Sequence, residues 1–222
     1  MAVVISAATQ AVSRLPAPAA VVVGLVSLAM VAIPGFWSLL DHFARIAHEG
    51  AHAVVGSCLD TKVTGVRLKM RERSGETELQ TAAGSGFVVL LVGYLGPSGF
   101  GLAAAGLIAH GQIVPVLWIG LALLAMLLPS LRTVFGVALV AGIGFVLLSV
   151  VRSRNAEVEA VTAYALSWLL LLSGVRAARE RGPISQDAIN LRQVTGLPRG
   201  LWALLWLVGS VAALVWGSTM LV

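Results

Sequence analysis

Two histidines and a glutamate lie close together in an apolar part of the chain, in the pentapeptide His48-Glu49-Gly50-Ala51-His52. On a helix, residues four apart share one face, so both imidazoles can reach one metal ion. The glutamate beside the first histidine then faces the open side of the metal, where it can take a proton from water. The pattern therefore predicts a zinc hydrolase site, with His48 and His52 as ligands and Glu49 as the catalytic base.

A catalytic zinc ion usually has three protein ligands and a fourth position for water. The remaining candidates for the third ligand are His42, His110, Glu157, Glu159, Glu180 and Asp187. His42 lies about one and a half helical turns before His48, so it cannot easily bind the same metal ion. Three candidates fall on the outer side in the topology given below, and Glu180 lies among arginines, where an ion pair is expected. Asp187 is left, and its alternative role is that of an acid in the first helical turn after Ser185.

The composition is that of an integral membrane protein. Of 222 residues, 58% are hydrophobic and 11% are charged, and the mean hydropathy is +0.94. An ordinary soluble domain has about 25% charged residues. The net charge of +5 comes from basic residues in short loops, which indicates topology signals and contacts with the lipid bilayer and argues against a nucleic-acid partner. The single cysteine, Cys58, excludes an internal disulfide and a zinc site of the cysteine type.

Seven apolar segments set the expected fold. A membrane-spanning helix needs about 20 apolar residues, with roughly 17 as the lower limit. We therefore predict an all-α polytopic membrane protein of about six to seven transmembrane helices, formed by residues 1–222 as a single domain. The segments are Ala17–Ile33, Gly35–Cys58, Phe87–Ala109, Ile113–Leu128, Val134–Val151, Val158–Val175 and Leu201–Val222.

The distribution of basic residues predicts the orientation of these segments. If the N-terminus is cytoplasmic and every segment crosses, Arg152 and Arg154 lie outside and Arg45 lies within the membrane. All other basic residues then lie on the cytoplasmic side, and an excess of basic residues on that side is typical of a correct topology. This topology places His52 about 9 Å from the cytoplasmic end of its helix. The 12 basic residues on the cytoplasmic side are Arg14, Lys62, Arg67, Lys69, Arg71, Arg73, Arg132, Arg176, Arg179, Arg181, Arg192 and Arg199.

A polar stretch follows the metal-binding segment at Thr61–Gln80. Apolar and charged residues alternate roughly within it, and Ser74-Gly75 is a turn signal. This pattern predicts a small β-hairpin on the cytoplasmic side, near the metal-binding helix, and the alternative is a solvated loop of mixed charge.

Ionisable residues inside apolar segments are costly and usually have a function. Asp41, Arg45, His48 and His52 fall on one stripe of the second segment, which must face protein or water, and Asp41 and Arg45 are spaced for an ion pair. The third segment contains many small residues around Gly93 and a proline at position 97. Small residues let helices approach closely in lipid, so this segment is expected to pack tightly, in particular against the metal-binding helix.

The chain resembles the site-2 protease family of intramembrane zinc metalloproteases, in particular its compact bacterial branch without a PDZ domain. The resemblance rests on the His48–His52 motif in a membrane helix, the following stretch at residues 61–80, the segment Gly93-Tyr94-Leu95-Gly96-Pro97-Ser98-Gly99, and Asp187 within residues 182–198. It implies a zinc ion held by His48, His52 and Asp187, with Glu49 activating water. Asn190 or Arg192 is a further candidate for supporting the oxyanion.

The resemblance also implies a biological role. Relatives cleave a peptide bond in or near a transmembrane segment of a membrane protein, so the expected partner is a single-span protein, for example a signalling protein such as an anti-sigma factor. The expected location is the bacterial inner (plasma) membrane, with the active site toward the cytoplasmic side. The alternative is a non-catalytic or divergent membrane protein, such as a metal-binding scaffold or a transporter, in which the stripe from Asp41 to His52 conducts or senses a cation.

Overall fold

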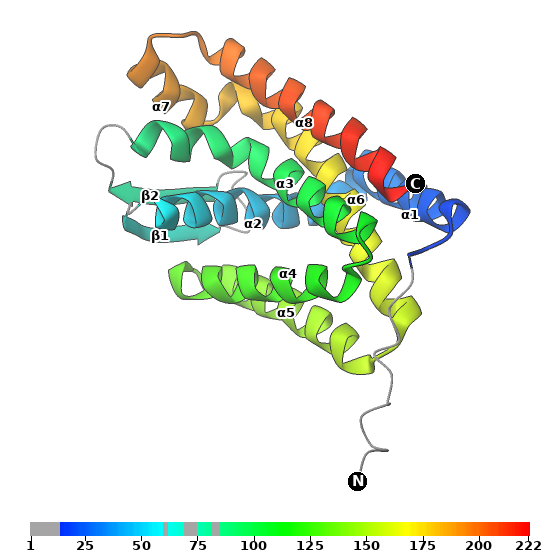
Figure 1. The fold of residues 1–222 in the computed structure, drawn as a ribbon. Coiled ribbons are helices and arrows are strands. Elements are labelled where there is room, and N and C mark those ends of the chain that lie inside the picture. The colour runs from blue at the N-terminus through cyan, green and yellow to red at the C-terminus, as the bar shows by residue number, and fades with distance from the viewer. Residues whose placement is uncertain (1–13, 60–61, 69–74, 81–84) are drawn as a thin grey trace.

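A computed structural model describes residues 14–59, 62–68, 75–80 and 85–222 as a bundle of helices with one pair of short strands (Figure 1). The strand pair and the short helix α7 lie at one end of the bundle, and α1 and the C-terminus lie at the other (Figure 1). The elements are α1 (Ala17–Ala32), α2 (Pro34–Cys58), β1 (Lys62–Leu68), β2 (Gly75–Gln80), α3 (Ser85–Ala109), α4 (Ile113–Leu127), η1 (Leu128–Ser130), α5 (Val134–Ser153), α6 (Ala156–Arg181), η2 (Gly182–Ile184), α7 (Gln186–Thr195) and α8 (Arg199–Leu221).

Each of the seven apolar segments forms a helix, but fewer of them than predicted can cross a membrane. By length and composition, four helices of the described residues are candidates, at Gly86–Ala109, Val134–Ser153, Ala156–Ile184 and Arg199–Leu221. Helix α4 has 15 residues and is about 22 Å long, whereas the hydrocarbon core is about 30 Å thick. The expected six to seven spans are therefore replaced by four, or by up to five if α1 and α2 together form one span.

The helices α1 and α2 were expected to be two spans and instead form one bent pair. They meet at an angle of 99° at the break between Ala32 and Pro34. A proline restricts the residue before it to extended backbone, and Ile33 has that conformation, with φ −76° and ψ 124°. Proline itself suits the first position of a helix, where its missing N–H is not needed, so the same residue ends α1 and starts α2. Since the sides were assigned on seven crossings, the cytoplasmic position of the site stays a prediction.

The strands β1 and β2 pair antiparallel within the range expected to form a hairpin. Lys62 lies opposite Gln80 and Leu68 opposite Gly75, with a shift in register between Val63 and Gly65. The expected turn at Ser74 lies outside the described residues. Both strands contact α2, so the pair adjoins the helix that carries the histidines.

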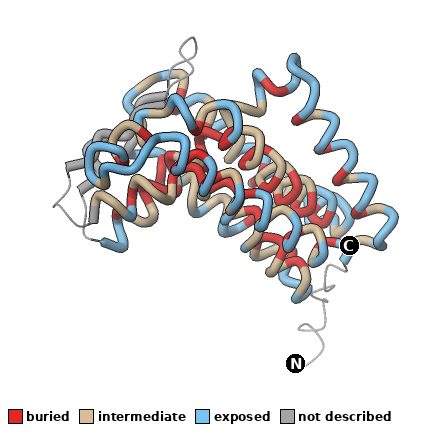
Figure 2. The backbone as a smooth tube through the Cα atoms, turned by 90° about the horizontal axis from the view of Figure 1, so that it is seen from above, coloured by how far each residue is buried: buried red, intermediate tan, exposed pale blue. Residues whose placement is uncertain are grey.

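Helices α3 and α6 form the centre of the bundle, and α2 and α8 pack against both of them. Buried residues line the facing sides of the helices, while the outer sides are exposed (Figure 2). Small residues make the contacts close, as predicted for the third segment: a Cβ atom at Gly101 would lie 2.8 Å from the backbone nitrogen of Leu171 on α6. This packing fixes the position of α3 between α2 and α6.

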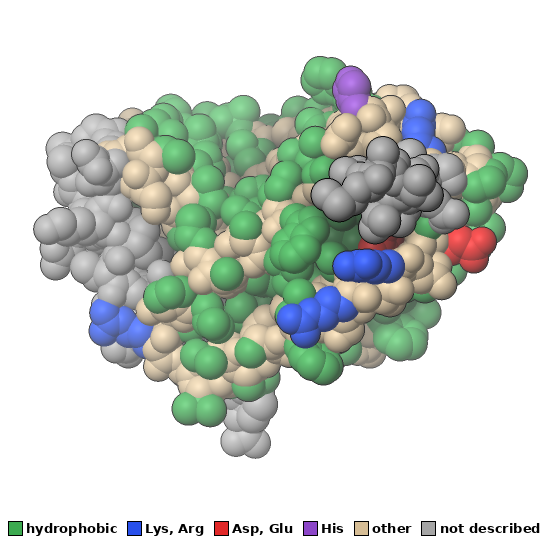
Figure 3. Space-filling view, turned by 60° about the horizontal axis from the view of Figure 1, so that its bottom comes forward, with side chains coloured by type: hydrophobic (Ala, Val, Ile, Leu, Met, Phe, Trp, Pro, Cys, Tyr) green, Lys and Arg blue, Asp and Glu red, His purple; other side chains and the backbone are tan. Residues whose placement is uncertain are grey.

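Large apolar side chains cover the outer surface of several helices. On α5, Val134 and Phe145 are 88% and 71% exposed, and on α8, Val215 and Trp216 are 60% and 62% exposed. The face drawn in Figure 3 is mostly hydrophobic, with charged side chains only at scattered points. An exposed apolar surface of this extent is typical of a protein in contact with lipid. With the candidate spans, it indicates a multi-pass membrane protein.

Candidate metal centre

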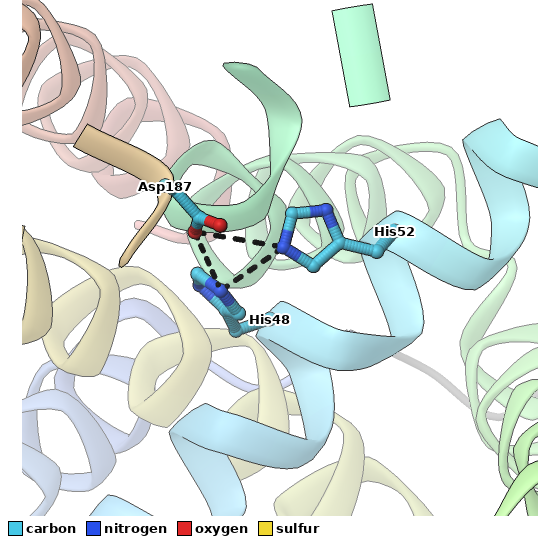
Figure 4. Close-up of side chains that lie close together, drawn as sticks. All are labelled: His48, His52 and Asp187. Atoms are coloured by element: carbon cyan, nitrogen blue, oxygen red, sulfur yellow. Dashed lines mark hydrogen bonds and ion pairs between the residues drawn. The ribbon is translucent and has the colours of Figure 1, made fainter. Parts of the chain in front are cut away.

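Two elements bring three metal-ligating side chains together. The histidines come from adjacent turns of α2, and Asp187 comes from the first turn of α7 (Figure 4). The two imidazole Nε2 atoms are 3.1 Å apart, and the Asp187 Oδ2 atom lies 3.1 Å from Nε2 of His48 and 3.6 Å from Nε2 of His52. One donor atom from each residue therefore points at a common centre.

The spacing of the three atoms suits a zinc ion. Zinc binds nitrogen and oxygen ligands at about 2.0–2.2 Å in tetrahedral geometry, which separates neighbouring ligand atoms by about 3.3–3.6 Å. The observed separations between the three donor atoms, 3.1 to 3.6 Å, overlap that range. Two imidazoles and one carboxylate also form a ligand set that catalytic zinc sites use, with the fourth position left for water.

A hydrogen bond at the back of one imidazole fixes its orientation. Nδ1 of His52 lies 2.8 Å from the carbonyl oxygen of Val89, to which it donates its proton. In the neutral imidazole, Nε2 then carries a lone pair and no proton, which is the tautomer that binds a metal through Nε2. That lone pair points toward the other histidine and the carboxylate oxygen. A lone pair on Nε2 of His52 that faces Nε2 of His48 and Oδ2 of Asp187 fits a metal ion shared by the three residues.

Helix α7 positions the candidate third ligand. The hydroxyl of Ser185 caps this helix by accepting a hydrogen bond from the backbone N–H of Ala188, 3.1 Å away, and Gly196 ends it in the left-handed conformation with φ 75°. Asp187 is thus an acid in the first helical turn and also a neighbour of both histidines, so the two roles weighed from the sequence are compatible. Burial would raise the pKa of the Asp187 carboxyl, but its interactions with His48 and His52 lower it below its ordinary value, which keeps the carboxylate ionised.

Helix α3 approaches the histidines at a glycine. A Cβ atom on Gly93 would lie 2.6 Å from Cε1 and Nε2 of His52 and 2.7 Å from Cε1 of His48. One turn later, a Cβ atom on Gly96 would collide with Ala51 of α2. The imidazoles therefore occupy the space that a side chain at position 93 would need.

Aromatic side chains hold the first histidine in place. The ring of Tyr94 contacts that of His48 edge to face, with centroids 4.5 Å apart, and on its other side it packs on Trp206 of α8 at 4.7 Å. Trp206 is itself fixed by donating its Nε1–H to the carbonyl oxygen of Leu91, 2.8 Å away. The sequence did not single out either aromatic residue for the site, since a lone tyrosine in an apolar helix carries no spacing signal.

The expected base lies in the interior beside the ligands. Glu49 follows His48 directly on α2 and is only 2% exposed. It is close enough to both histidines and to Asp187 for their charges to act on its carboxylate. Its position is suited to proton transfer at the metal centre, away from bulk water.

Several of the other sequence candidates have local partners. Nδ1 of His42 lies 3.0 Å from the Ser38 carbonyl, and Glu180 pairs with Arg176 at 2.7 Å, as expected from its arginine neighbours. Asn190 accepts a hydrogen bond from Gln186, and Arg192 is exposed. The structure therefore gives no support for an oxyanion role of these last two residues.

Comparison with known protein families matches residues 21–217 to the family described as Peptidase M50B-like. The chain belongs to this family. The match covers most of the chain and confirms the resemblance to the site-2 proteases, and it supports peptidase activity in a membrane protein. Comparison with curated proteins and with solved structures gave no match.

The structure gives a direct prediction for the third ligand. Replacing Asp187 by asparagine keeps the size of the side chain but removes the negative charge from the ligand triangle. We expect zinc affinity to fall by at least about 100-fold, since the effect of losing a ligand should exceed the 10- to 100-fold effect of losing an outer-shell partner. The measurement is a competition titration of purified protein with a chromophoric chelator.

The control for Asp187→Asn is Gln186→Ala, which changes an exposed neighbour in the same helical turn. This control should bind zinc like the wild type. Equal affinity of Asp187→Asn and the wild type would show that the aspartate acts only as a first-turn acid of α7.

Proposed function

We propose that the protein is a zinc-dependent intramembrane endopeptidase that hydrolyses a peptide bond in or near a transmembrane segment of a membrane protein. The observation that carries this proposal is the convergence of His48 Nε2, His52 Nε2 and Asp187 Oδ2 beside a buried Glu49, inside a bundle with an apolar outer surface. Family membership supports the peptidase activity, and the ligand set supports zinc.

The residues of the chain divide the chemistry between them. Zinc, when bound by His48, His52 and Asp187, polarises the scissile carbonyl and lowers the pKa of water toward neutrality. The carboxylate of Glu49 accepts the proton of the attacking water and then delivers it to the nitrogen of the leaving amine. The Val89 carbonyl holds the His52 imidazole in its ligating tautomer throughout.

A substrate helix must open before it can be cut. Its carbonyls are held in backbone hydrogen bonds, so a stretch around the scissile bond has to become extended. We propose that an edge of the β1–β2 pair holds this stretch by strand addition, because the pair adjoins α2. Water is proposed to reach the site from the cytoplasmic side of a bacterial inner membrane, and the substrate is proposed to be a single-span protein such as an anti-sigma factor.

Removal of the metal tests this function. Purified protein in detergent or nanodiscs should cleave a single-span model substrate, and treatment with a strong chelator should abolish the cleavage. Adding zinc back should restore it, because the ligands remain in place. The control is an equal concentration of the chelator already saturated with zinc, which should leave cleavage unchanged.

Two results would contradict the proposal. Cleavage that persists in metal-free protein would exclude a zinc mechanism. Stoichiometric zinc without cleavage of any single-span substrate, combined with zinc uptake into proteoliposomes, would favour the alternative of a metal transporter.

A further inference from the structure

We propose that Arg181 is a positioning residue of the metal centre: its ion pair with Asp41 holds the segment that carries Asp187 against the metal-binding helix α2. The proposal rests on the proposed function, because it concerns the third ligand of the zinc site. It adds a residue that touches none of the three ligands and that the sequence pattern did not select.

Asp41 lies between two arginines. Its Oδ2 atom accepts hydrogen bonds from Nε and a terminal nitrogen of Arg45, at 3.0 and 2.7 Å, one turn further along α2. Its Oδ1 atom lies 3.2 Å from a terminal nitrogen of Arg181, on a different helix. The side chains of the three residues are 14%, 7% and 16% exposed, so the cluster is largely shielded from solvent. The first contact is local to α2, whereas the second joins α2 to the end of α6.

Arg181 stands where the chain leaves α6 for the third ligand. It is the last residue of that helix, and the short helix η2 and the first turn of α7 then lead to Asp187. On the other side, Gly182 is buried against α8, where an added Cβ would lie 3.4 Å from Ala203 and 3.5 Å from Trp206. The connection is therefore held between α2, through the ion pair, and α8, through close packing.

The charge of Arg181 also reaches the catalytic side of α2. Arg181 is close enough for its own charge to act on Glu49 and on Tyr94.

A second contact at the end of α6 serves a different element. Arg176 donates hydrogen bonds to the carbonyl oxygens of Val31 and Ala32 at the end of α1, and its guanidinium lies 4.6 Å from the ring centroid of Trp37. This contact satisfies carbonyls freed by the break between α1 and α2. Glu180 of the same turn also accepts a hydrogen bond from Nε1 of Trp37 on α2, 3.0 Å away, but Arg181 is the residue at which the chain leaves α6 for Asp187.

The test compares Arg181→Met with Arg179→Met. Methionine keeps much of the length of the side chain and removes the charge, and Arg179 is an exposed arginine two residues earlier on the same helix. For Arg181→Met we expect zinc to bind about 10- to 100-fold more weakly, the usual effect of losing an outer-shell partner. Arg179→Met should bind zinc like the wild type.

Two further readouts separate positioning from a general loss of structure. Cobalt(II) in place of zinc reports ligand geometry through its absorption spectrum, and the spectrum of Arg181→Met should shift toward that of Asp187→Asn. Arg181→Lys should recover most of the zinc affinity, since an ammonium group can still pair with the Asp41 carboxylate. If Arg181→Met does not fold, Asp41→Asn removes the same ion pair and should weaken zinc binding in the same way.

The outcomes are distinct. Wild-type protein that binds no metal would overturn the proposed function itself, whatever Arg181 does. With zinc bound to the wild type, equal affinities of Arg181→Met and Arg179→Met would overturn the positioning role. The same holds if Arg181→Lys loses as much affinity as Arg181→Met, or if Asp41→Asn binds zinc normally.

Discussion

Replacing Glu49 by glutamine should abolish peptide-bond cleavage and leave zinc bound. Glutamine has the shape of glutamate but cannot take a proton from water. A general base contributes about 10²- to 10⁴-fold to a rate, so cleavage should fall by at least that factor. The three converging donor atoms come from other residues, so zinc stoichiometry and affinity should not change. Cleavage of a single-span substrate and metal analysis of the same sample measure both effects.

The matched control for Glu49→Gln is Glu157→Gln. That glutamate is exposed in the first turn of α6, so the same chemical change there should affect neither cleavage nor zinc. Proteolysis that survives Glu49→Gln would remove Glu49 from the mechanism. Loss of zinc from this variant would instead make the glutamate a ligand.

The local parts of the site could be predicted from the sequence because a helix fixes the relation between residues three and four apart. That relation is enough to pair His48 with His52 and Asp41 with Arg45, and the structure shows both contacts. It also gives the stripe that faces the interior, on which Arg45 and His52 are buried. No knowledge of the fold was needed for these contacts.

Contacts between elements were harder to predict. In lipid, the outer and inner faces of a helix are both apolar, so hydrophobicity does not show which helices meet. The approach of Gly93 to the histidines, the packing of Tyr94 on His48 and the pairing of Arg181 with Asp41 all depend on such meetings. The oxyanion role suggested for Asn190 and Arg192 stays a prediction.

The number of spans was overestimated because apolar length alone was counted. The segment at Ile113–Leu128 is apolar throughout, but its helix α4 has only 15 residues. The first two segments are divided by a proline that bends the chain by 99°. Hydropathy indicates that a segment prefers lipid, but crossing also depends on its length and direction.

A single methyl group at Gly93 should have an effect on the metal centre comparable to the loss of a ligand. In Gly93→Ala, the new Cβ atom would lie 2.6 Å from the His52 ring and 2.7 Å from the His48 ring, too close for either imidazole to keep its place. Metal–ligand distances tolerate changes of only about 0.2 Å. We therefore expect zinc affinity to fall by at least about 100-fold, with loss of cleavage, as measured by chelator competition and by metal analysis.

The control for Gly93→Ala lies on the same helix. An added Cβ at Gly99 meets nothing within 4 Å, so Gly99→Ala should bind zinc like the wild type. In a helix, alanine is favoured over glycine by about 1 kcal/mol, so this control should be as stable as the wild type or slightly more stable. Zinc affinity of Gly93→Ala equal to that of Gly99→Ala would mean that α3 lies farther from the histidines than the structure shows.

The comparison also separates two explanations for the glycines of α3. If they served only to let helices pack, then Gly93→Ala would lower the free energy of unfolding. Cobalt(II) bound in place of zinc would then keep the absorption spectrum that it has in the wild type. If Gly93 instead leaves room for the imidazoles, the spectrum itself must change, because His48 and His52 have to rotate or move away from α3. The distances from position 93 to the two rings favour the second explanation, in which the absence of a side chain on α3 is part of the proposed metal centre.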